Sequence, residues 1–198
     1  MALVPPIAAL LLLAAAAAAG PPDPGQRARA LRATDALGRE IAVPIPGRLT
    51  LLAFASYSNG EAVGAISREL RVDHPEIENL SFLDLSGVPR VARGLMRQAI
   101  VMRQAGAVEE MREAFARAGK VPPNDLDERA YVIPDFEAEH FAAYGVLDTD
   151  TRPRMLLIGP DGVVKAVFEA HSLEAARSAV DRALAPETPA VAAAPAGE

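Results

Sequence analysis

Few side chains in this sequence could do chemistry, and Ser58 with Glu61 is the most suggestive pair. A serine nucleophile needs a base, and the three histidines, His74, His140 and His171, stand in no recognisable triad motif. At a helix start, the Ser-x-x-Glu spacing forms a capping box, in which the hydroxyl and the carboxylate accept each other's backbone N–H groups. We therefore predict that Ser58 and Glu61 cap a helix rather than catalyse a reaction.

Metal and cofactor sites are not indicated. The 198 residues include no cysteine, which excludes disulfides, thiol catalysis, zinc–thiolate sites and iron–sulfur ligation. Glu137, Glu139 and His140 are close in sequence, but on a helix only Glu137 shares a face with His140. Asp148 and Asp150 lack the calcium-loop pattern, and no glycine-rich nucleotide motif occurs. We expect no metal and no cofactor.

Ser58 and Glu61 are positioned by a strand, a turn and a helix. The apolar run Leu49 to Ala55 predicts a strand buried on both faces. The chain breaks at residues 56–60, and a helical pattern follows, with Ala62, Ala65, Ile66 and Leu70 on one face. The sequence thus predicts that a buried strand delivers Ser58 to a helix N-terminus.

The rest of the chain predicts alternating strands and helices. Residues 27–37 could be a short helix or irregular, and residues 34–44 resemble a small hairpin turning at Leu37-Gly38. Val88 to Gln104 is predicted as a helix with Val91, Leu95, Ala99 and Met102 on one face, separated by residues 105–107 from a solvated helix, Val108 to Ala118. The remaining predictions are strands Leu80–Leu85 and Ala130–Asp135, a helix 136–144 capped by Asp135, a hairpin of strands 155–158 and 163–168, and a helix from the cap Ser172 to Leu184.

This pattern resembles the thioredoxin-like superfamily, in its exported TlpA, peroxiredoxin and YtfJ-like branch. In that family a strand delivers T/S-W-C-x-x-C onto a helix N-terminus; here Ser56 and Tyr57 match the first two positions, while Ser58 and Glu61 replace both cysteines. Residues 152–164 also match the family's hairpin phrase x-P-t-x-f-l-i-d-x-d-G, so Pro153 is the candidate cis proline. The resemblance implies an α/β three-layer sandwich, with a mixed sheet of four or five strands flanked by helices, a helical insert at 88–118, and no thiol-disulfide oxidoreductase or peroxidase activity.

The N- and C-terminal segments of the chain differ in composition from the predicted domain between them. The apolar run Ile7 to Ala19, ending in small residues, predicts a signal peptide at 1–19, with an uncleaved anchor as the alternative. A proline-rich lead-in, 20–33, the domain, 34–184, and a disordered Ala/Pro tail, 185–198, would follow. We expect export to the periplasm or beyond and no membrane span after cleavage. The formal net charge of −6 argues against a nucleic-acid partner.

Two functions remain open on the surface that would carry the family's active site. The first is a redox-inactive module that binds a protein or peptide outside the cytoplasm through Tyr57, Ser58, Glu61, Arg152 and Pro153. The second is a non-thiol enzyme or metal carrier, in which His140 or His171 would approach Glu61. A structural domain whose tail carries the function is a third possibility.

Overall fold

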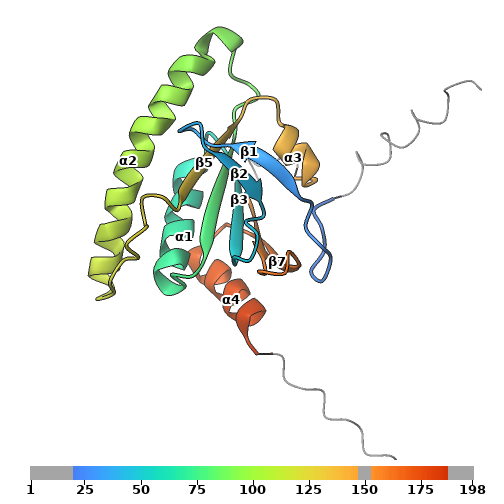
Figure 1. Ribbon diagram of the computed structural model, residues 1–198, viewed down its shortest axis with the longest axis vertical. Coiled ribbons are helices and arrows are strands. Elements are labelled where there is room, and N and C mark those ends of the chain that lie inside the picture. Colours follow the sequence, from blue (N-terminus) through green and yellow to red (C-terminus); the bar gives the residue numbers. More distant parts are fainter. Residues whose placement is uncertain (1–19, 147–152, 187–198) are drawn as a thin grey trace, which may run out of the picture.

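A five-stranded mixed sheet forms the centre of the molecule (Figure 1). The computed structural model describes residues 20–146 and 153–186. The sheet order is β5-β4-β3-β6-β7; β3, β4 and β5 run parallel, and β6 and β7 are antiparallel to their neighbours. The strands are β3 (Thr50–Ser56), β4 (Glu78–Asp84), β5 (Ala130–Asp135), β6 (Arg154–Ile158) and β7 (Val164–Glu169). The predicted sheet and its hairpin are confirmed.

Strand β3 lies in the middle of this sheet, and all seven of its side chains are buried. Leu52 and Phe54 belong to the core on one face, while Leu51, Ala53 and Ala55 belong to the core on the other. A strand that is covered on both faces needs a continuous apolar run rather than alternation. The sequence prediction of a doubly buried strand is confirmed.

Helices and a small hairpin cover the two faces (Figure 1). α1 (Gly60–Asp73) and α4 (Leu173–Leu184) pack on one face. α3 (Glu139–Ala143) and the antiparallel pair β1 (Leu31–Thr34) and β2 (Glu40–Val43) pack on the other. The three-layer sandwich is confirmed. β1 shows that the helical alternative for residues 27–37 is wrong, whereas the predicted turn, with Gly38 at φ 84°, is present.

The helical insert differs from the prediction in two ways. A 3₁₀ turn, η2 (Arg90–Ala92), leads into one continuous helix, α2 (Arg93–Arg117), which runs through residues 105–107 without a break. The alanines beside Gly106 favour helix strongly enough to offset the cost of the glycine, which is about 1 kcal/mol.

The predicted inner face of this helix is also wrong. Val91 is 97% exposed, Leu95 73% and Met102 72%, whereas Ile100, Gln104 and Phe115 are buried. α2 contacts only α1, β5 and η2 closely, so one stripe of the helix is covered and the other faces solvent.

Several predicted segments lie outside the described residues. These are the signal peptide 1–19, Asp148, Asp150, Arg152 and the tail beyond residue 186. Within residues 20–146 and 153–186, no helix is both long enough and apolar enough to cross a membrane. Part of the predicted lead-in, residues 20–33, is hydrogen-bonded to the β6–β7 hairpin. The backbones of Gly25 and Gln26 form hydrogen bonds with that of Val164, and the N–H of Ala28 donates to the carbonyl of Gly162.

The cap of α4 provides a test of the fold. Ser172 Oγ accepts the N–H of Ala175 at 3.2 Å, as expected for an N-cap. Replacing it by Ser172→Ala should lower the free energy of unfolding by about 1 kcal/mol. Urea unfolding followed by circular dichroism measures this. The control Ser178→Ala, at an exposed position inside the same helix, should be neutral or slightly stabilising; equal losses in the two variants would contradict the assignment.

Candidate functional site

The junction of β3 and α1 carries three of the predicted site residues. α1 begins at Gly60 and its N-cap is Asn59, so the predicted capping box at Ser58 is wrong. The Asn59 side chain instead closes the turn by accepting the N–H of Ser56 at 3.0 Å, and the hydroxyls of Ser56 and Ser58 lie 2.8 Å apart. The Glu61 carboxylate forms an ion pair with Arg103 of α2 at 3.4 Å.

Tyr57 and Pro153 differ sharply in exposure. Tyr57 is 69% exposed, so its ring stands out from the turn into solvent. Pro153 is buried, and its carbonyl accepts the N–H of Ala170 at 2.8 Å. Arg152, and with it the peptide bond to Pro153, lies outside the described residues, so the cis proline there stays a prediction.

Tyr57, Ser58 and Glu61 line one end of a hollow that the sequence did not reveal. This hollow, which we call the α1–α2 groove, has a volume of about 540 Å³ and lies between α1, α2 and strands β3 to β5. Two ion pairs join its helices, Glu61 with Arg103 and Arg68 with Glu110. Both pairs are 42 residues apart in sequence, which shows that the two helices run side by side in the same direction.

Buried polar groups form the inner wall of the α1–α2 groove. Arg71 is 1% exposed, Ser67 2% and Gln104 6%. Within the part of the chain that the structure describes, five side-chain atoms of residues lining the groove have no hydrogen-bond partner: Ser67 Oγ, Arg71 Nε, Arg71 Nη2, Asn79 Oδ1 and Gln104 Oε1. Sequence reasoning missed Arg71 because its type predicts exposure; its only signal is its place directly after Leu70 on the buried face of α1.

The surroundings of Arg71 leave its charge poorly compensated. Burial, together with the neighbouring Arg129 cation, lowers the pKa of Arg71, and the charges of Glu78, Asp125 and Tyr131 oppose this only in part. Glu78 lies 2.9 Å from Arg129 Nε in a buried ion pair. Arg71 makes one hydrogen bond, from Nη1 to the Arg129 carbonyl at 3.3 Å.

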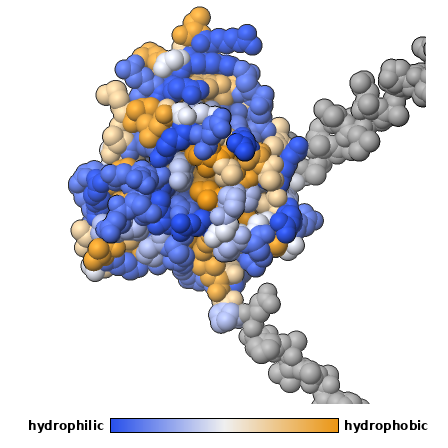
Figure 2. Space-filling model, viewed as in Figure 1, coloured by the Kyte–Doolittle hydropathy of each residue, from blue (hydrophilic) through white to orange (hydrophobic). Residues whose placement is uncertain are grey.

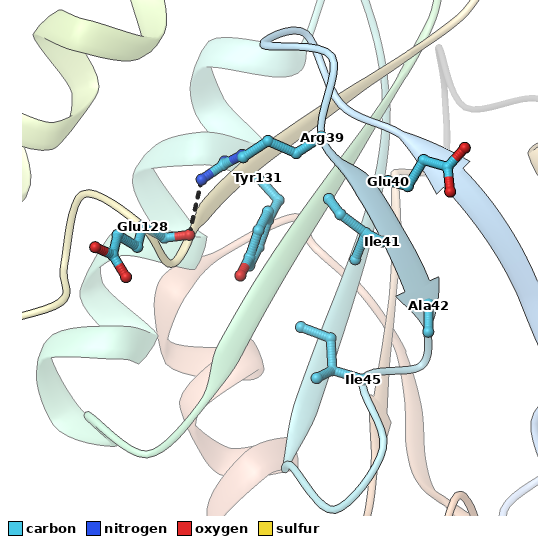
Figure 3. A pocket seen from close by; sticks show the side chains of 7 residues that line it. All are labelled: Arg39, Glu40, Ile41, Ala42, Ile45, Glu128 and Tyr131. Carbon is cyan, nitrogen blue, oxygen red and sulfur yellow. Dashed lines mark hydrogen bonds between the residues drawn. The ribbon is translucent and has the colours of Figure 1, made fainter.

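A second hollow, of about 450 Å³, opens on the opposite face beside β2 (Figure 3). Figure 3 shows Arg39 reaching past the ring of Tyr131 to the backbone of Glu128. Its guanidinium also donates to Asp35 at 2.6 Å and to the Ala130 carbonyl at 2.8 Å. All three nitrogens of Arg39 therefore have partners inside the protein, and this arginine ties the hairpin to β5 rather than awaiting a ligand.

The enzyme or metal-carrier hypothesis requires His140 or His171 near Glu61, and the structure places neither of them there. His140 lies on α3, on the face of the sheet opposite α1, and neither His140 nor His171 lines the α1–α2 groove. His171 Nε2 lies 2.7 Å from Glu169, and His74 Nε2 lies 3.1 Å from Asp181. Among the described residues, no group of three or more His, Asp or Glu is placed to hold a metal ion.

His140 instead forms a pair with Asp135 that anchors α3. The predicted N-cap at Asp135 is wrong, because α3 begins at Glu139 and its N-cap is Ala138. Asp135 is 3% exposed and still bonds the start of the helix, since it accepts the N–H groups of Glu139, His140 and Phe141. Burial would raise the pKa of Asp135, but the His140 ring and these N–H groups outweigh it and hold the pKa below its usual value. In turn, the Asp135 carboxylate, 3.3 Å from Nδ1, raises the pKa of His140.

This pair predicts a pH-dependent stability. The folded-state pKa of His140 lies above the unfolded value, so its stabilisation is complete below about pH 6.5 and is lost as the pH rises through the folded-state pKa. The substitution His140→Gln should therefore cost about 1 kcal/mol more at low than at high pH. Chemical unfolding between pH 5 and pH 9 (roughly the range in which histidine titrates) tests this. The exposed His171→Gln serves as the control, and a pH-independent loss in His140→Gln would contradict the pairing.

Comparison with known proteins supports the fold and not a closer relationship. No protein-family model matches the chain, and no curated protein sequence is similar to it. The structure is similar to that of a thiol:disulfide interchange protein, described as DsbE, from Chlorobium tepidum: TM-score 0.53, 14% identity, covering 81% of this chain and 97% of that one. Weaker likenesses are to a secreted Mycobacterium tuberculosis disulfide oxidoreductase (TM-score 0.46, 16% identity, 77% and 95% covered) and to StoA from Bacillus subtilis (TM-score 0.46, 14% identity, 79% and 99% covered). The chain thus has the thioredoxin-like fold of thiol-disulfide oxidoreductases, built without a single cysteine.

Proposed function

We propose that this protein is a redox-inactive, exported binding module that holds a protein or peptide at the junction of β3 and α1. The observation that carries the proposal is Tyr57, a large aromatic side chain that is 69% exposed at the turn where the family places its reactive cysteines. Aromatic side chains in such positions are typical anchors of protein interfaces, because they bury much area at a low cost in side-chain entropy. The chain contains no cysteine, so thiol chemistry is excluded on this surface, which favours binding.

α2, the helix beside α1, carries further exposed apolar side chains. Met96 and Arg103 line the same groove as Tyr57, and their sequence neighbours Leu95 and Met102 are both more than 70% exposed. Figure 2 shows apolar surface at the end of the molecule where α2 begins. We call Tyr57, Leu95 and Met102 the Tyr57 surface. An exposed aromatic ring, with exposed apolar side chains on the neighbouring helix, favours a partner that is itself apolar at its centre.

Pro153 can contribute less to peptide binding than the sequence suggested. In the family, backbone groups beside the cis proline pair with a bound peptide. The Pro153 carbonyl is already occupied by Ala170, so such pairing would rest on the backbone of Arg152. The proposal therefore depends chiefly on the side chains of the Tyr57 surface.

Site-specific crosslinking tests this surface. A photoreactive phenylalanine analogue at position 57 should crosslink one defined partner in the cell envelope, and the same analogue at position 121 should not, although Val121 is 88% exposed. With the partner purified, Tyr57→Ala combined with Leu95→Ala should weaken binding by at least about tenfold, because truncating two interface anchors costs 1 kcal/mol or more each.

The control for this experiment is Val121→Ala, which removes a similar apolar side chain beyond the C-terminal end of α2. If position 121 crosslinks the same partners as position 57, or if the double variant binds as tightly as the wild type, this surface is not the binding site.

Export can be tested separately. The proposal rests on the apolar run Ile7 to Ala19 and its small C-terminal residues. The mature protein recovered from the cell envelope should begin at Gly20, which intact-mass analysis measures. Full-length protein in the membrane fraction would instead indicate an uncleaved anchor, and full-length protein in the cytoplasm would refute export.

A further inference from the structure

The α1–α2 groove contains buried polar atoms that the protein itself leaves unsatisfied. Arg71 Nε and Nη2, Ser67 Oγ, Asn79 Oδ1 and Gln104 Oε1 belong to residues that line this one hollow, and none of these atoms has a hydrogen-bond partner among the described residues. In native proteins nearly all such groups are paired, because a buried polar atom without a hydrogen bond opposes folding. Five of them around a single hollow indicate that the missing partner is not among the described residues, and a bound ligand would supply it.

The two unpaired nitrogens of Arg71 indicate which chemical group the ligand would present to the groove. Nη1 is bonded to the Arg129 carbonyl, which leaves Nε and Nη2 free. These two nitrogens form the edge of a guanidinium that donates two parallel hydrogen bonds to a carboxylate. The contrast with Arg39, whose three nitrogens all have partners, shows that an arginine in this fold can be satisfied internally.

The ion pairs around the groove favour a ligand with a single negative charge. Glu61 is paired with Arg103 across the groove, and Arg68 is paired with Glu110. Among the described residues, Arg71 is the one charged side chain lining the groove that has no ion-pair partner within 4 Å.

The remaining lining is apolar and leaves room for a small molecule. Gly64, Ala65 and Ala107 line the groove with little or no side chain, and Met96 and Val108 add apolar surface. A Cβ built on Gly64 would meet no atom within 4 Å outside its own helix, so the space beside it is open. The volume of about 540 Å³ falls within the range of small-molecule sites, which is roughly 300–1,000 Å³.

We propose that the α1–α2 groove binds a small organic monocarboxylate with an apolar body, held by the Nε and Nη2 edge of Arg71. The oxygens of Ser67, Asn79 and Gln104 then accept hydrogen bonds from a hydroxyl or amine on the ligand. This inference does not rest on the proposed function, because Arg71 and Gly64, the residues that test it, are not part of the Tyr57 surface.

The experiment uses the folded protein and three probe acids: 3-phenylpropionate, octanoate and indole-3-acetate. Each is titrated into ¹⁵N-labelled protein and followed by NMR, with the corresponding neutral amide as a matched probe. We expect at least one acid to bind with one-to-one stoichiometry, to shift the backbone signals of Ala65 and Ala107, and to bind at least about tenfold more tightly than its amide.

Two variants and one control locate the binding. Arg71→Met should abolish the preference for acid over amide, whereas Arg48→Met, at an exposed arginine, should keep it. Arg71→Met should also leave the melting temperature unchanged or raise it, because it removes an unpartnered buried cation. Gly64→Leu fills the groove and should abolish binding of both probes in a protein that remains folded.

The proposal is overturned if none of the three acids binds at about 10 mM, a concentration well above the dissociation constants of specific small-molecule sites. It is also overturned if the acid binds equally well to wild type and to Arg71→Met. Should Arg71→Met fail to fold, Gly64→Leu decides the matter, since unimpaired acid binding in that variant would place the ligand elsewhere. Failure of these tests would leave crosslinking at position 57 unaffected, so the two proposals can be judged separately.

Discussion

The double burial of β3 is the constraint on which the rest of this structure depends. Its seven side chains contact solvent hardly at all, and its backbone pairs with β4 on one side and β6 on the other. An apolar strand in this position requires a covering layer on each face, and α1 with α4 supplies one while α3 with the β1–β2 hairpin supplies the other. The turn that carries Tyr57 and Ser58 leaves the sheet directly from this strand, so the position of the candidate site follows from the core.

The parallel strands β3, β4 and β5 explain why polar groups gather at one edge. Ser56, Asp84 and Asp135 are the last residues of these strands, and they are paired in register across the sheet. Because the carboxyl ends of parallel strands meet at one edge, turns and helix starts collect there. In this chain the edge holds a structural pair, Asp135 with His140, beside an exposed aromatic ring. The pair that stabilises α3 and the proposed binding surface thus lie at the same edge of the sheet.

Arg39 and Arg71 show how the same residue type can have different roles in one fold. Arg39 donates to Asp35 and to two backbone carbonyls, and so joins the N-terminal hairpin to β5. Arg71 occupies a more deeply buried site and has one such bond. A group that opposes folding unless it is paired is more easily explained by a ligand than by the fold, because an apolar residue of similar size would stabilise the protein at least as well.

The sequence by itself determined the order of the elements, the doubly buried strand, the hairpin before the last helix and the exclusion of thiol chemistry. These depend on local periodicity, turn residues and composition, which a single chain displays directly. The tertiary structure alone decided which stripe of α2 is covered, that Arg71 is buried and that each histidine is paired with a carboxylate other than Glu61. Each of these outcomes depends on contacts between segments far apart in the chain, such as α1 with α2, and α3 with β5. Local patterns carry no information about such contacts, and for that reason Tyr57 could be placed at a strand–helix junction from sequence while the groove beside it could not.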